Sequence, residues 1–501
     1  MGKYRLFLVS VLITTAVIAV LSSCNQNIKM ETKELRWGYS TEPATLDPLN
    51  PANTADGRSI LFNVFEGLVK PDIDGTFLPC IAESWTVDQN ARVYNFLLRE
   101  GVRFHDGALL TAQDVKFSLD TAVAKGFIGL GNIEEVRISA ENEISVILKS
   151  ADPDFLPYLT TGIVKEGNAD REKNITGTGP FLVESYTPQR NLILRKFDNY
   201  WQSNPAHLEK ITIAFFANSD SLMVALRGGG IDGAFITGSM AAQLDHREFD
   251  FFFNNSAAVQ LLALNNNSPP LNDINIRRAL VHCIDVPGII DTAFFGQGQH
   301  SASPLIPGLS IYYENTIIYP YNPNLARALL SQAGFNETNR LSLEITAPSN
   351  FTMHVDTAQV IVSQLENIGV NASIKLVDWP TWISQVYIGR QHQATIISLD
   401  SPTVSPRGFL HRYYSSDGGN FINFNNADYD RVYDAVLTEA DTARRVGLYR
   451  EAQRIITEDA ASVFIQDIFY FIVLRSGVFS GALDYPLYVI DFSSLYKVSK
   501  H

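Results

Sequence analysis

The fold of this chain is decided by residues 79–120, which read PCIAESWTVDQNARVYNFLLREGVRFHDGALLTAQDVKFSLD. From Ala91 to Arg99 apolar and polar side chains alternate, which predicts a β-strand. Val102-Arg103-Phe104 predicts a second short strand after a turn, so the two strands are expected to pair as a hairpin. Thr111 and Asp114 form the pattern of a capping box, which predicts that a helix begins there. The stretch is thus predicted to fold in the order strand, turn, strand, helix.

Several short motifs in and beyond this stretch follow one another in a fixed order. They are Ala82-Glu83-Ser84-Trp85, Arg99-Glu100-Gly101-Val102, Phe104-His105-Asp106-Gly107, Asp114-Val115-Lys116-Phe117-Ser118, Thr176-Gly177-Thr178-Gly179-Pro180-Phe181, Asn199-Tyr200-Trp201 and Ile276-Arg277-Arg278-Ala279-Leu280. Together they resemble the signature of the family 5 extracellular solute-binding proteins, the dipeptide, oligopeptide and nickel receptors of bacterial ABC importers. The resemblance implies an α/β fold of the two-lobed periplasmic-binding-protein (Venus flytrap) type, with an extra subdomain in the first lobe.

The resemblance and the expected elements together predict how the chain is divided. We expect the first lobe in residues 34–60, 177–267 and 480–501, the extra subdomain in 61–176, and the second lobe in 268–479. The alternation of apolar strand and helix patterns between Leu341 and Val377 predicts a β-α-β unit in the second lobe. In the first lobe, Ile60 to Val69 predicts a helix.

The first residues predict export and a membrane anchor. Lys3 and Arg5 precede an apolar run from Leu6 to Leu21, which is shorter than the roughly 20 residues that a membrane-spanning helix needs and is typical of a signal peptide. Leu21-Ser22-Ser23-Cys24 resembles a bacterial lipobox, which implies cleavage after residue 23 and lipid attachment to Cys24. The alternative is an ordinary secretory peptide with a coincidental cysteine. Residues 24–33 are then expected to be a tether, with the protein on the periplasmic or outer side of a membrane.

Composition excludes several classes of function. The formal net charge is −14 at pH 7 and no basic run offsets it, which argues against nucleic acid as a partner. Cys80 and Cys283 could form a disulfide, but Cys283 lies in an apolar helical pattern, which favours two buried thiols. The histidines show no paired spacing, which argues against a direct metal site. No cofactor is expected. Neither Gly-x-Ser-x-Gly nor His-Glu-x-x-His occurs, so an enzyme is not expected.

The main candidate for a ligand contact is Asp400, which ends the apolar strand pattern Ala394–Asp400. In the peptide-binding members of the family, the acid that matches Asp400 pairs with the α-ammonium group of the ligand. A buried carboxylate is costly unless a cation reaches it, so such a site would select ligand charge. The alternative is a loop aspartate that caps a helix. The sequence departs from the family around this acid, with Ser398-Leu399 before it and Ser401-Pro402-Thr403 after it.

Other candidate ligand-binding residues follow from the resemblance. His354 lies near a histidine that oligopeptide receptors use toward a ligand carboxylate, with a solvated histidine as the alternative. Trp379 matches an aromatic residue of the cleft, with core packing as the alternative. Glu42 lies in a Pro-rich segment expected to cross the cleft, and Arg407, like Arg412, is a candidate counter-ion. Residues 348–350 offer no arginine for a ligand carboxylate, which argues against strict dipeptide specificity.

Three functions remain to be compared. The resemblance favours a lipid-anchored receptor, expected to be a monomer, that closes two lobes around a short peptide and delivers it to an ABC permease and its ATPase. The same fold could instead bind a metal chelate such as nickel or haem, or an oligosaccharide. A receptor that signals rather than transports is a further alternative.

Overall fold

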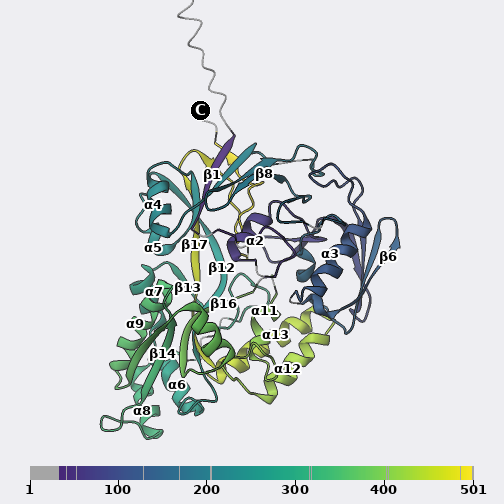
Figure 1. Ribbon diagram of the computed structural model, residues 1–501. Helices are drawn as coiled ribbons and strands as arrows, with labels where there is room; N and C mark the ends of the chain where they lie inside the picture. Colours follow the sequence, from purple (N-terminus) through teal and green to yellow (C-terminus); the bar gives the residue numbers. More distant parts are fainter. Residues whose placement is uncertain are drawn as a thin grey trace, which may run out of the picture.

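The computed structural model describes residues 33–498, except 41, 44, 52, 128, 169, 204–205, 315, 317–318, 402, 404 and 486, and without the side chains of 253–257 and 468–469. The predicted signal peptide and the predicted lipid-attachment residue, Cys24, lie outside the described residues. Figure 1 shows an upper part that carries β1, α2 and α4, and a lower part that carries α6, α8 and β14. We call the upper part lobe I and the lower part lobe II.

A mixed sheet of eleven strands runs through both lobes (Figure 1). Its order is β15-β14-β16-β12-β17-β11-β1-β10-β9-β8, and β13 pairs with β17 outside this path. The strands are β1 Glu34–Tyr39, β8 Phe181–Thr187, β9 Asn191–Lys196, β10 Lys210–Phe215, β11 Gly233–Thr237, β12 Phe249–Leu264, β13 Gly298–His300, β14 Ser342–Pro348, β15 Asn371–Val377, β16 Ala394–Asp400 and β17 Ser462–Arg475.

Two long antiparallel strands, β12 and β17, connect the lobes (Figure 1). The first part of β12, Phe249–Asn255, pairs with the part of β17 that also pairs with β11 of lobe I. The second part, Val259–Ala263, pairs with the first part of β17 and with β16 of lobe II. The register shifts between Asn255 and Val259, so the regular ladder is interrupted where the chain passes between the lobes.

Lobe I packs both faces of its part of the sheet. On one face, α4 (Ser219–Arg227) and the short α5 (Gly238–Ala241) cover the sheet, with Leu222 and Leu226 packed in the same cluster as Ala234 and Val473. On the other face, Trp37 and its neighbours belong to a large core that continues into the extra subdomain. This continuous core fixes the extra subdomain against lobe I.

The extra subdomain is a four-stranded antiparallel sheet with a helix on it. The sheet has the order β4-β5-β7-β6, and α3 packs on it. These elements are β4 Ala82–Val87, β5 Val93–Leu98, β6 Ile133–Ala140, β7 Glu143–Leu148 and α3 Ala112–Ala124; a separate hairpin of β2 Val69–Pro71 and β3 Phe77–Pro79 precedes them, and the short helices η1 Leu130–Asn132 and η2 Leu156–Thr160 lie in the loops.

The central sequence motif is partly confirmed and partly wrong. The capping box is present, with Thr111 as N-cap of α3 and Asp114 accepting from the Thr111 backbone N–H. The predicted hairpin between residues 91–99 and 102–104 does not form, because both edges of β5 are taken by β4 and β7. Instead residues 102–110 form a tight loop, in which the Leu110 N–H donates to the Val102 carbonyl.

The helix expected at Ile60–Val69 begins earlier and ends earlier than predicted. It is α2, Ala55–Leu61, with Thr54 as N-cap. It ends because Asn63 and Val64 use their carbonyls to accept from the Phe181 and Gly179 N–H groups rather than to continue the helix. The prediction therefore missed the first turn of α2, which proves important for the candidate site.

Lobe II is a three-layer structure. On β12, Leu262 and Leu264 face one group of helices, and Leu261 and Ala263 face the other, as the alternation of a strand requires. The first group is α6 Ile274–Cys283, α7 Val286–Phe294, α8 Pro323–Gln332 and α9 Thr352–Glu366; the second comprises the π-helix η3 Trp382–Ile388, α11 Arg407–Leu410, η4 His411–Tyr413, α12 Ala427–Thr438 and α13 Thr442–Glu458, and the short α10 Trp379–Thr381 precedes η3. The predicted β-α-β unit is confirmed as β14, α9 and β15.

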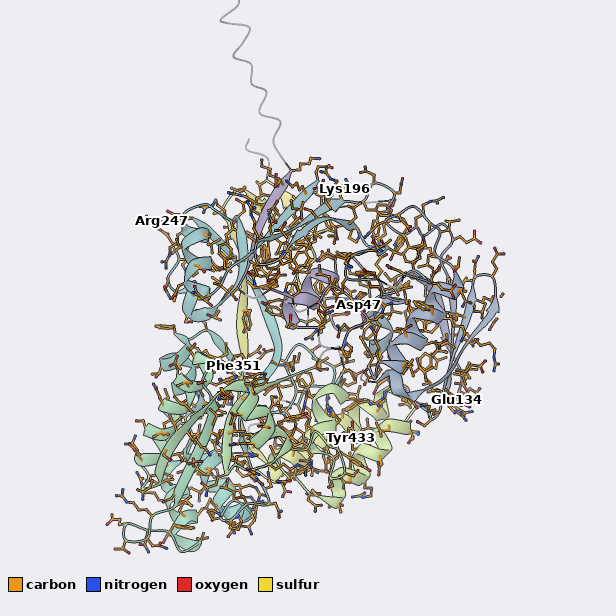
Figure 2. All side chains as sticks on the ribbon, in the orientation of Figure 1. Asp47, Glu134, Lys196, Arg247, Phe351 and Tyr433 are labelled. Atoms are coloured by element: carbon orange, nitrogen blue, oxygen red, sulfur yellow. The ribbon has the colours of Figure 1, made fainter. Side chains whose placement is uncertain are left out.

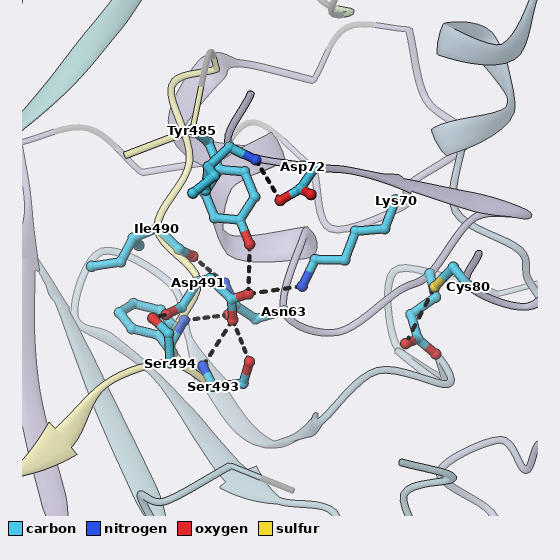
Figure 3. A network of polar contacts seen from close by, with 12 residues as sticks. Asn63, Lys70, Asp72, Cys80, Tyr485, Ile490, Asp491, Ser493 and Ser494 are labelled. Carbon is cyan, nitrogen blue, oxygen red and sulfur yellow. Dashed lines mark hydrogen bonds and ion pairs between the residues drawn. The ribbon is translucent and has the colours of Figure 1, made fainter. Parts of the chain in front are cut away.

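The C-terminal segment returns to lobe I after β17 and is fixed there by buried polar contacts (Figure 3). Lys70 Nζ lies 2.7 Å from Asp491 Oδ2, and Asn63 Nδ2 donates to the Ile490 carbonyl over 2.8 Å. A short pair of strands, β18 (Phe479–Ser480) and β19 (Tyr496–Lys497), completes the segment. Cys80 and Cys283 are both free and buried, as expected from the sequence.

Candidate functional site

Three parallel strands of lobe II end at the same edge of the sheet, and the segments that follow them carry several predicted site residues. Strand β14 runs parallel to β15 and β16, with Thr346 opposite Thr395. Strand β16 continues to Asp400, three residues further than β14 does to Pro348, or roughly 10 Å at the rise of a strand. Asp400 therefore projects beyond this edge, where β12 passes toward lobe I.

The side chain of Asp400 is more open than the sequence suggests. The expectation of a buried carboxylate was wrong, since 55% of the side chain is exposed. Its nearest cationic partner comes from the other lobe, with Arg58 Nη2 3.7 Å from Asp400 Oδ2. Asp400 is thus one side of an ion pair that bridges lobe II and helix α2 of lobe I.

The first turn of α2 carries two charged residues, Asp56 and Arg58, of which Arg58 contacts lobe II. Arg58 is 39% exposed and its Nη1 donates to the Asn53 carbonyl over 2.8 Å. Burial raises the pKa of Asp56 to about 6, although a hydrogen bond with Tyr488 opposes the shift. Neither residue was proposed from the sequence, because the predicted helix started at Ile60. The sequence signal that could have identified both residues is the pair Asp56-x-Arg58 directly before an apolar helical run.

His354 is buried rather than solvated. Its ring Nδ1 lies 3.1 Å from Nε2 of Gln260, and since an amide nitrogen can only donate, Nδ1 accepts. Burial lowers the pKa of His354 to about 4, so the ring is neutral at pH 7. Gln260 in turn accepts from Gln466, so this chain of side chains links α9 to both crossover strands. His354 is therefore placed as an uncharged group beside the crossover.

Trp379 combines packing with exposure. Its ring stacks on Trp382 at 5.0 Å between centroids and 4° between planes, and 38% of the residue is exposed. Phe351 meets Trp379 edge-on at 5.4 Å and also contacts His354. Figure 2 shows Phe351 at the upper side of lobe II, next to the crossover strands. An aromatic surface thus lies at the same edge of the sheet as Asp400.

Ser398 is a further residue of this region that sequence reasoning did not select. It lies two residues before Asp400, so both side chains point to the same face of β16. It is directly opposite Gln260, which shares that face. Its buried hydroxyl has no hydrogen-bond partner among the residues that the structure describes. Ser398, Gln260 and Asp400 therefore form one polar row.

Glu42 and the two candidate arginines have partners within the protein. Glu42 accepts from the Tyr186 hydroxyl (2.5 Å) and from the Gln189 N–H (2.8 Å). Arg407 Nη1 lies 2.5 Å from Asp152 Oδ1, and Arg412 donates to the Gly408 carbonyl. None of these contacts places Glu42, Arg407 or Arg412 beside Asp400.

A second contact between the lobes is built from buried charges. It joins the loop before η2, in the extra subdomain, to α11 and α13 of lobe II. Arg445 Nε lies 2.9 Å from Asp154 Oδ1, and the Tyr449 hydroxyl also donates to Asp154. Burial raises the pKa of Asp154, while the charge of Arg445 opposes this. The two lobes thus meet through an open ion pair, Arg58–Asp400, and a buried cluster.

Two pockets lie elsewhere in lobe II. A polar pocket of about 540 Å³ is lined by residues such as Asn265, Arg390 and Asn423, and an apolar one of about 230 Å³ by residues such as Val286 and Phe464. Neither contains a predicted site residue. Among the described residues, no group of three or more His, Cys, Asp or Glu side chains could hold a metal ion. Within the same part of the chain, no helix has the length and apolar character needed to cross a bilayer.

Comparison with known proteins agrees with this architecture. Di/tripeptide-binding protein 1 of Pseudomonas aeruginosa is 25% identical over 507 aligned positions, which cover 91% of this chain and 92% of that protein. The dipeptide-binding protein of Escherichia coli is 24% identical and covers 91% and 93%, respectively.

Solved structures show the same fold. The substrate-binding protein CtaP of Listeria monocytogenes has a TM-score of 0.83 at 22% identity, covering 93% of this chain and 99% of that one. The oligopeptide-binding protein AppA of Bacillus subtilis, solved with a nonapeptide, has a TM-score of 0.77 at 20% identity, covering 93% and 99%. These likenesses confirm the two-lobed α/β fold expected from the sequence.

The match at the level of the family covers well over half of the chain. Residues 76–421 match the family described as bacterial extracellular solute-binding proteins, family 5 Middle. This range contains the motifs of residues 82–118 and extends past Asp400. The chain belongs to the family 5 bacterial extracellular solute-binding proteins.

Proposed function

We propose that this protein captures short peptides between its lobes and delivers them to an ABC permease and its ATPase. The observation that carries the proposal is the position of Asp400, a half-exposed carboxylate at the end of β16 that faces lobe I. Relatives that bind dipeptides and tripeptides align with most of the chain, which supports peptides as the ligand class.

The groups around Asp400 suit the parts of a peptide. Asp400 would pair with the α-ammonium group, and Ser398 offers a hydroxyl for a main-chain group next to it. Trp379 and Phe351 would pack against a ligand side chain. His354 is neutral at pH 7, so it could serve a ligand only by a hydrogen bond and not as a positive charge.

We assign Arg407 and Glu42 to the framework rather than to the ligand. Arg407 is paired with Asp152 across the lobes, and Glu42 is held by Tyr186 and the backbone of Gln189. Moving either side chain to a ligand would leave a polar partner unpaired, which costs free energy. This proposal leaves Asp400, Ser398, His354 and Trp379 as the ligand-facing set.

Closure of the lobes would bend the two crossover strands. We place the hinge where β12 changes register between Asn255 and Val259, next to Asp467 of β17. An interrupted ladder resists bending less than a regular one does, and among the described strands of the central sheet β12 and β17 are the two that pass between the lobes. The lobe boundaries expected from the sequence lie elsewhere, after residue 267, beyond β12, and after residue 479, beyond β17.

The lipid anchor and the monomeric state complete the proposal. Cys24 would carry the lipid and residues 25–33 would tether the lobes to the membrane, where a permease can receive the ligand. A monomeric receptor needs no partner subunit to close its lobes.

The test is the affinity of the Asp400→Asn variant for peptides. Binding of alanine peptides of two to six residues, with a free or an acetylated amino group, can be measured by calorimetry. For the free-amine peptides we expect a loss of about tenfold, or roughly 1.4 kcal/mol, because the ammonium loses its partner in a partly solvated site. For the acetylated peptides we expect no change, and equal effects on both forms would contradict the role of Asp400.

A further inference from the structure

We propose that Arg58 is an internal counter-ion of Asp400, so that a ligand's ammonium group binds by replacing the Arg58 guanidinium. The inference deepens the proposed function and rests on it, because the exchange needs a cationic ligand at Asp400. Arg58 would then be a specificity-determining residue contributed by lobe I. Arg58 competes with the ligand's cationic end for Asp400 and does not itself contact that end.

The geometry of the pair suits exchange. Arg58 meets Asp400 by a single contact, Nη2 to Oδ2 at 3.7 Å, and both side chains keep 39% and 55% of their surface exposed. The other bridge between the lobes, Arg445–Asp154, is 2.9 Å long with 8% exposed on each side. Exposed and loosely aligned pairs contribute little net free energy, whereas buried and hydrogen-bonded ones are costly to break. A small ammonium group can therefore replace Arg58 at Asp400 but could not replace Arg445 at Asp154.

Arg58 has a second anchor that remains when Asp400 is taken. Its Nη1 donates to the Asn53 carbonyl over 2.8 Å, just before the N-cap of α2. Asn53 is itself held, since its Nδ2 donates to the Asp47 carbonyl over 3.1 Å. The guanidinium thus has one hydrogen bond that does not depend on Asp400, and 39% of the side chain is exposed to solvent. The exchange leaves no buried charge without a partner.

The local charge balance favours a cationic newcomer. Two acids, Asp56 and Asp400, and one base, Arg58, come together between α2 and the end of β16. A ligand ammonium would complete the neutralisation of this group, and a ligand carboxylate would add to its negative charge. A ligand without a cation cannot break the Arg58–Asp400 pair by substitution. The pair therefore lowers the affinity of every ligand that must displace Arg58 from Asp400. A cationic ligand regains free energy by pairing with Asp400 itself, and an uncharged ligand does not.

The experiment compares the wild type with Arg58→Gln, using the alanine peptides of two to six residues in free and N-acetylated form. With the competitor removed, the affinity for the free-amine peptides should rise roughly two- to fivefold, the range that an exposed ion pair can contribute. The acetylated peptides should bind unchanged. Arg58→Lys, which keeps the charge, should bind close to the wild type and shows that the site tolerates substitution.

The chain offers a matched control. Lys375 Nζ lies 3.7 Å from Glu344 Oε1, with side chains 46% and 51% exposed, in the β14–β15 pair away from Asp400. Lys375→Gln should leave the affinity for both peptide forms unchanged. In the background of Asp400→Asn, Arg58→Gln should lose its effect, since a double-mutant cycle isolates the coupling of the two residues.

The failures of the two proposals are distinguishable. If the wild type binds none of the peptides, the proposed function fails and this inference fails with it. If the wild type binds them but Arg58→Gln has no effect, only the exchange is overturned. If Arg58→Gln lowers the affinity, Arg58 is a direct ligand contact and the exchange is likewise overturned.

Discussion

Asp154 of the extra subdomain and Arg445 of α13 form a buried ion pair between the two lobes, with 2.9 Å between Oδ1 and Nε and 8% of each side chain exposed. The two residues are 291 positions apart in the chain. Tyr449, one turn further along α13, donates its hydroxyl to the same carboxylate. Arg407 and Asp152 make a second pair beside it. Buried charges therefore join the extra subdomain to lobe II, beside an apolar contact that Phe77 of β3 makes with the core of lobe II.

Removing one partner of this pair should destabilise the protein strongly. Arg445→Met leaves the buried Asp154 carboxylate with the Tyr449 hydroxyl and the more distant charge of Arg407, and we expect a loss of about 3 kcal/mol in the free energy of unfolding. Urea unfolding measures this. Arg454→Met on the same helix is the control, because Arg454 pairs with Glu451 and Glu458 at the surface and should matter far less. Equal effects of the two substitutions would refute the view that the cluster carries the contact between the lobes.

The anchor of the C-terminal segment should respond to pH. Burial favours the neutral form of Asp491, but Lys70 overcomes this and holds the pKa of Asp491 below its usual value. A depressed pKa stabilises the fold above the unfolded value, near 4, and this stabilisation is lost as the pH falls through the folded value. Lys70→Met should therefore cost stability at pH 7 and cost much less at about pH 3.

Unfolding in urea at both pH values checks this prediction. Lys116→Met, which removes an exposed pair with Asp120 on α3, is the control and should show a small effect at either pH. A loss for Lys70→Met that is the same at both pH values would mean that the Asp491 charge is not what Lys70 stabilises.

Asp56 should make ligand affinity depend on pH between 5 and 7. Burial raises the pKa of Asp56 to about 6, so the side chain is mostly protonated at pH 5 and mostly ionised at pH 7. Its neighbours Tyr39, Tyr470 and Tyr488 have raised pKa values and stay neutral in this range. The added negative charge should raise the affinity for free-amine peptides about threefold, as expected for a screened charge interaction.

Asp56→Asn is the variant that checks this origin. It should remove the rise in affinity between pH 5 and 7. It should also remove a cost to stability, because a raised carboxyl pKa favours the fold below the unfolded value and this advantage is lost as the pH passes about 6. A pH profile that is unchanged in the variant would assign the dependence to another group.

Membrane attachment should depend on one sulfur atom. Cys24→Ser removes the predicted site of lipid attachment, so the protein should move from the membrane fraction to the soluble fraction after cell lysis. Cys283→Ser, at a buried thiol far along the chain, should stay in the membrane fraction if it folds. Retention of the Cys24→Ser variant in the membrane would show that the N-terminal segment is anchored in another way.

Local signals in the sequence predicted the elements that depend on local interactions. The capping box at Thr111 satisfies backbone groups within one turn, so its prediction does not depend on where the helix packs. The β-α-β unit of lobe II was predicted from its alternating apolar patterns. The hairpin at Val102–Phe104 failed because pairing is a tertiary choice, and β4 and β7 occupy both edges of β5.

At the candidate site, the predictions failed for residues whose contact partners lie far away in the chain. Arg407 was a candidate counter-ion, but its partner Asp152 lies in another subdomain. His354 was expected to be solvated or ligand-facing, and its burial follows from Gln260 on a crossover strand. Arg58 was missed because the helix that carries it starts at Ala55, before the predicted start. Asp400 was placed correctly at the end of its strand, although its exposure depends on how the lobes face each other.

The most direct test of the central claim is native mass spectrometry of the soluble form that starts at Asn25, purified from cells grown in rich medium. Denaturation after the first spectrum releases whatever ligand is bound, and its mass is then measured. Our account predicts a series of short peptides with free amino groups, bound one per protein molecule and at lower occupancy in the Asp400→Asn variant. A single non-peptide mass, such as a metal chelate or a sugar, would contradict it.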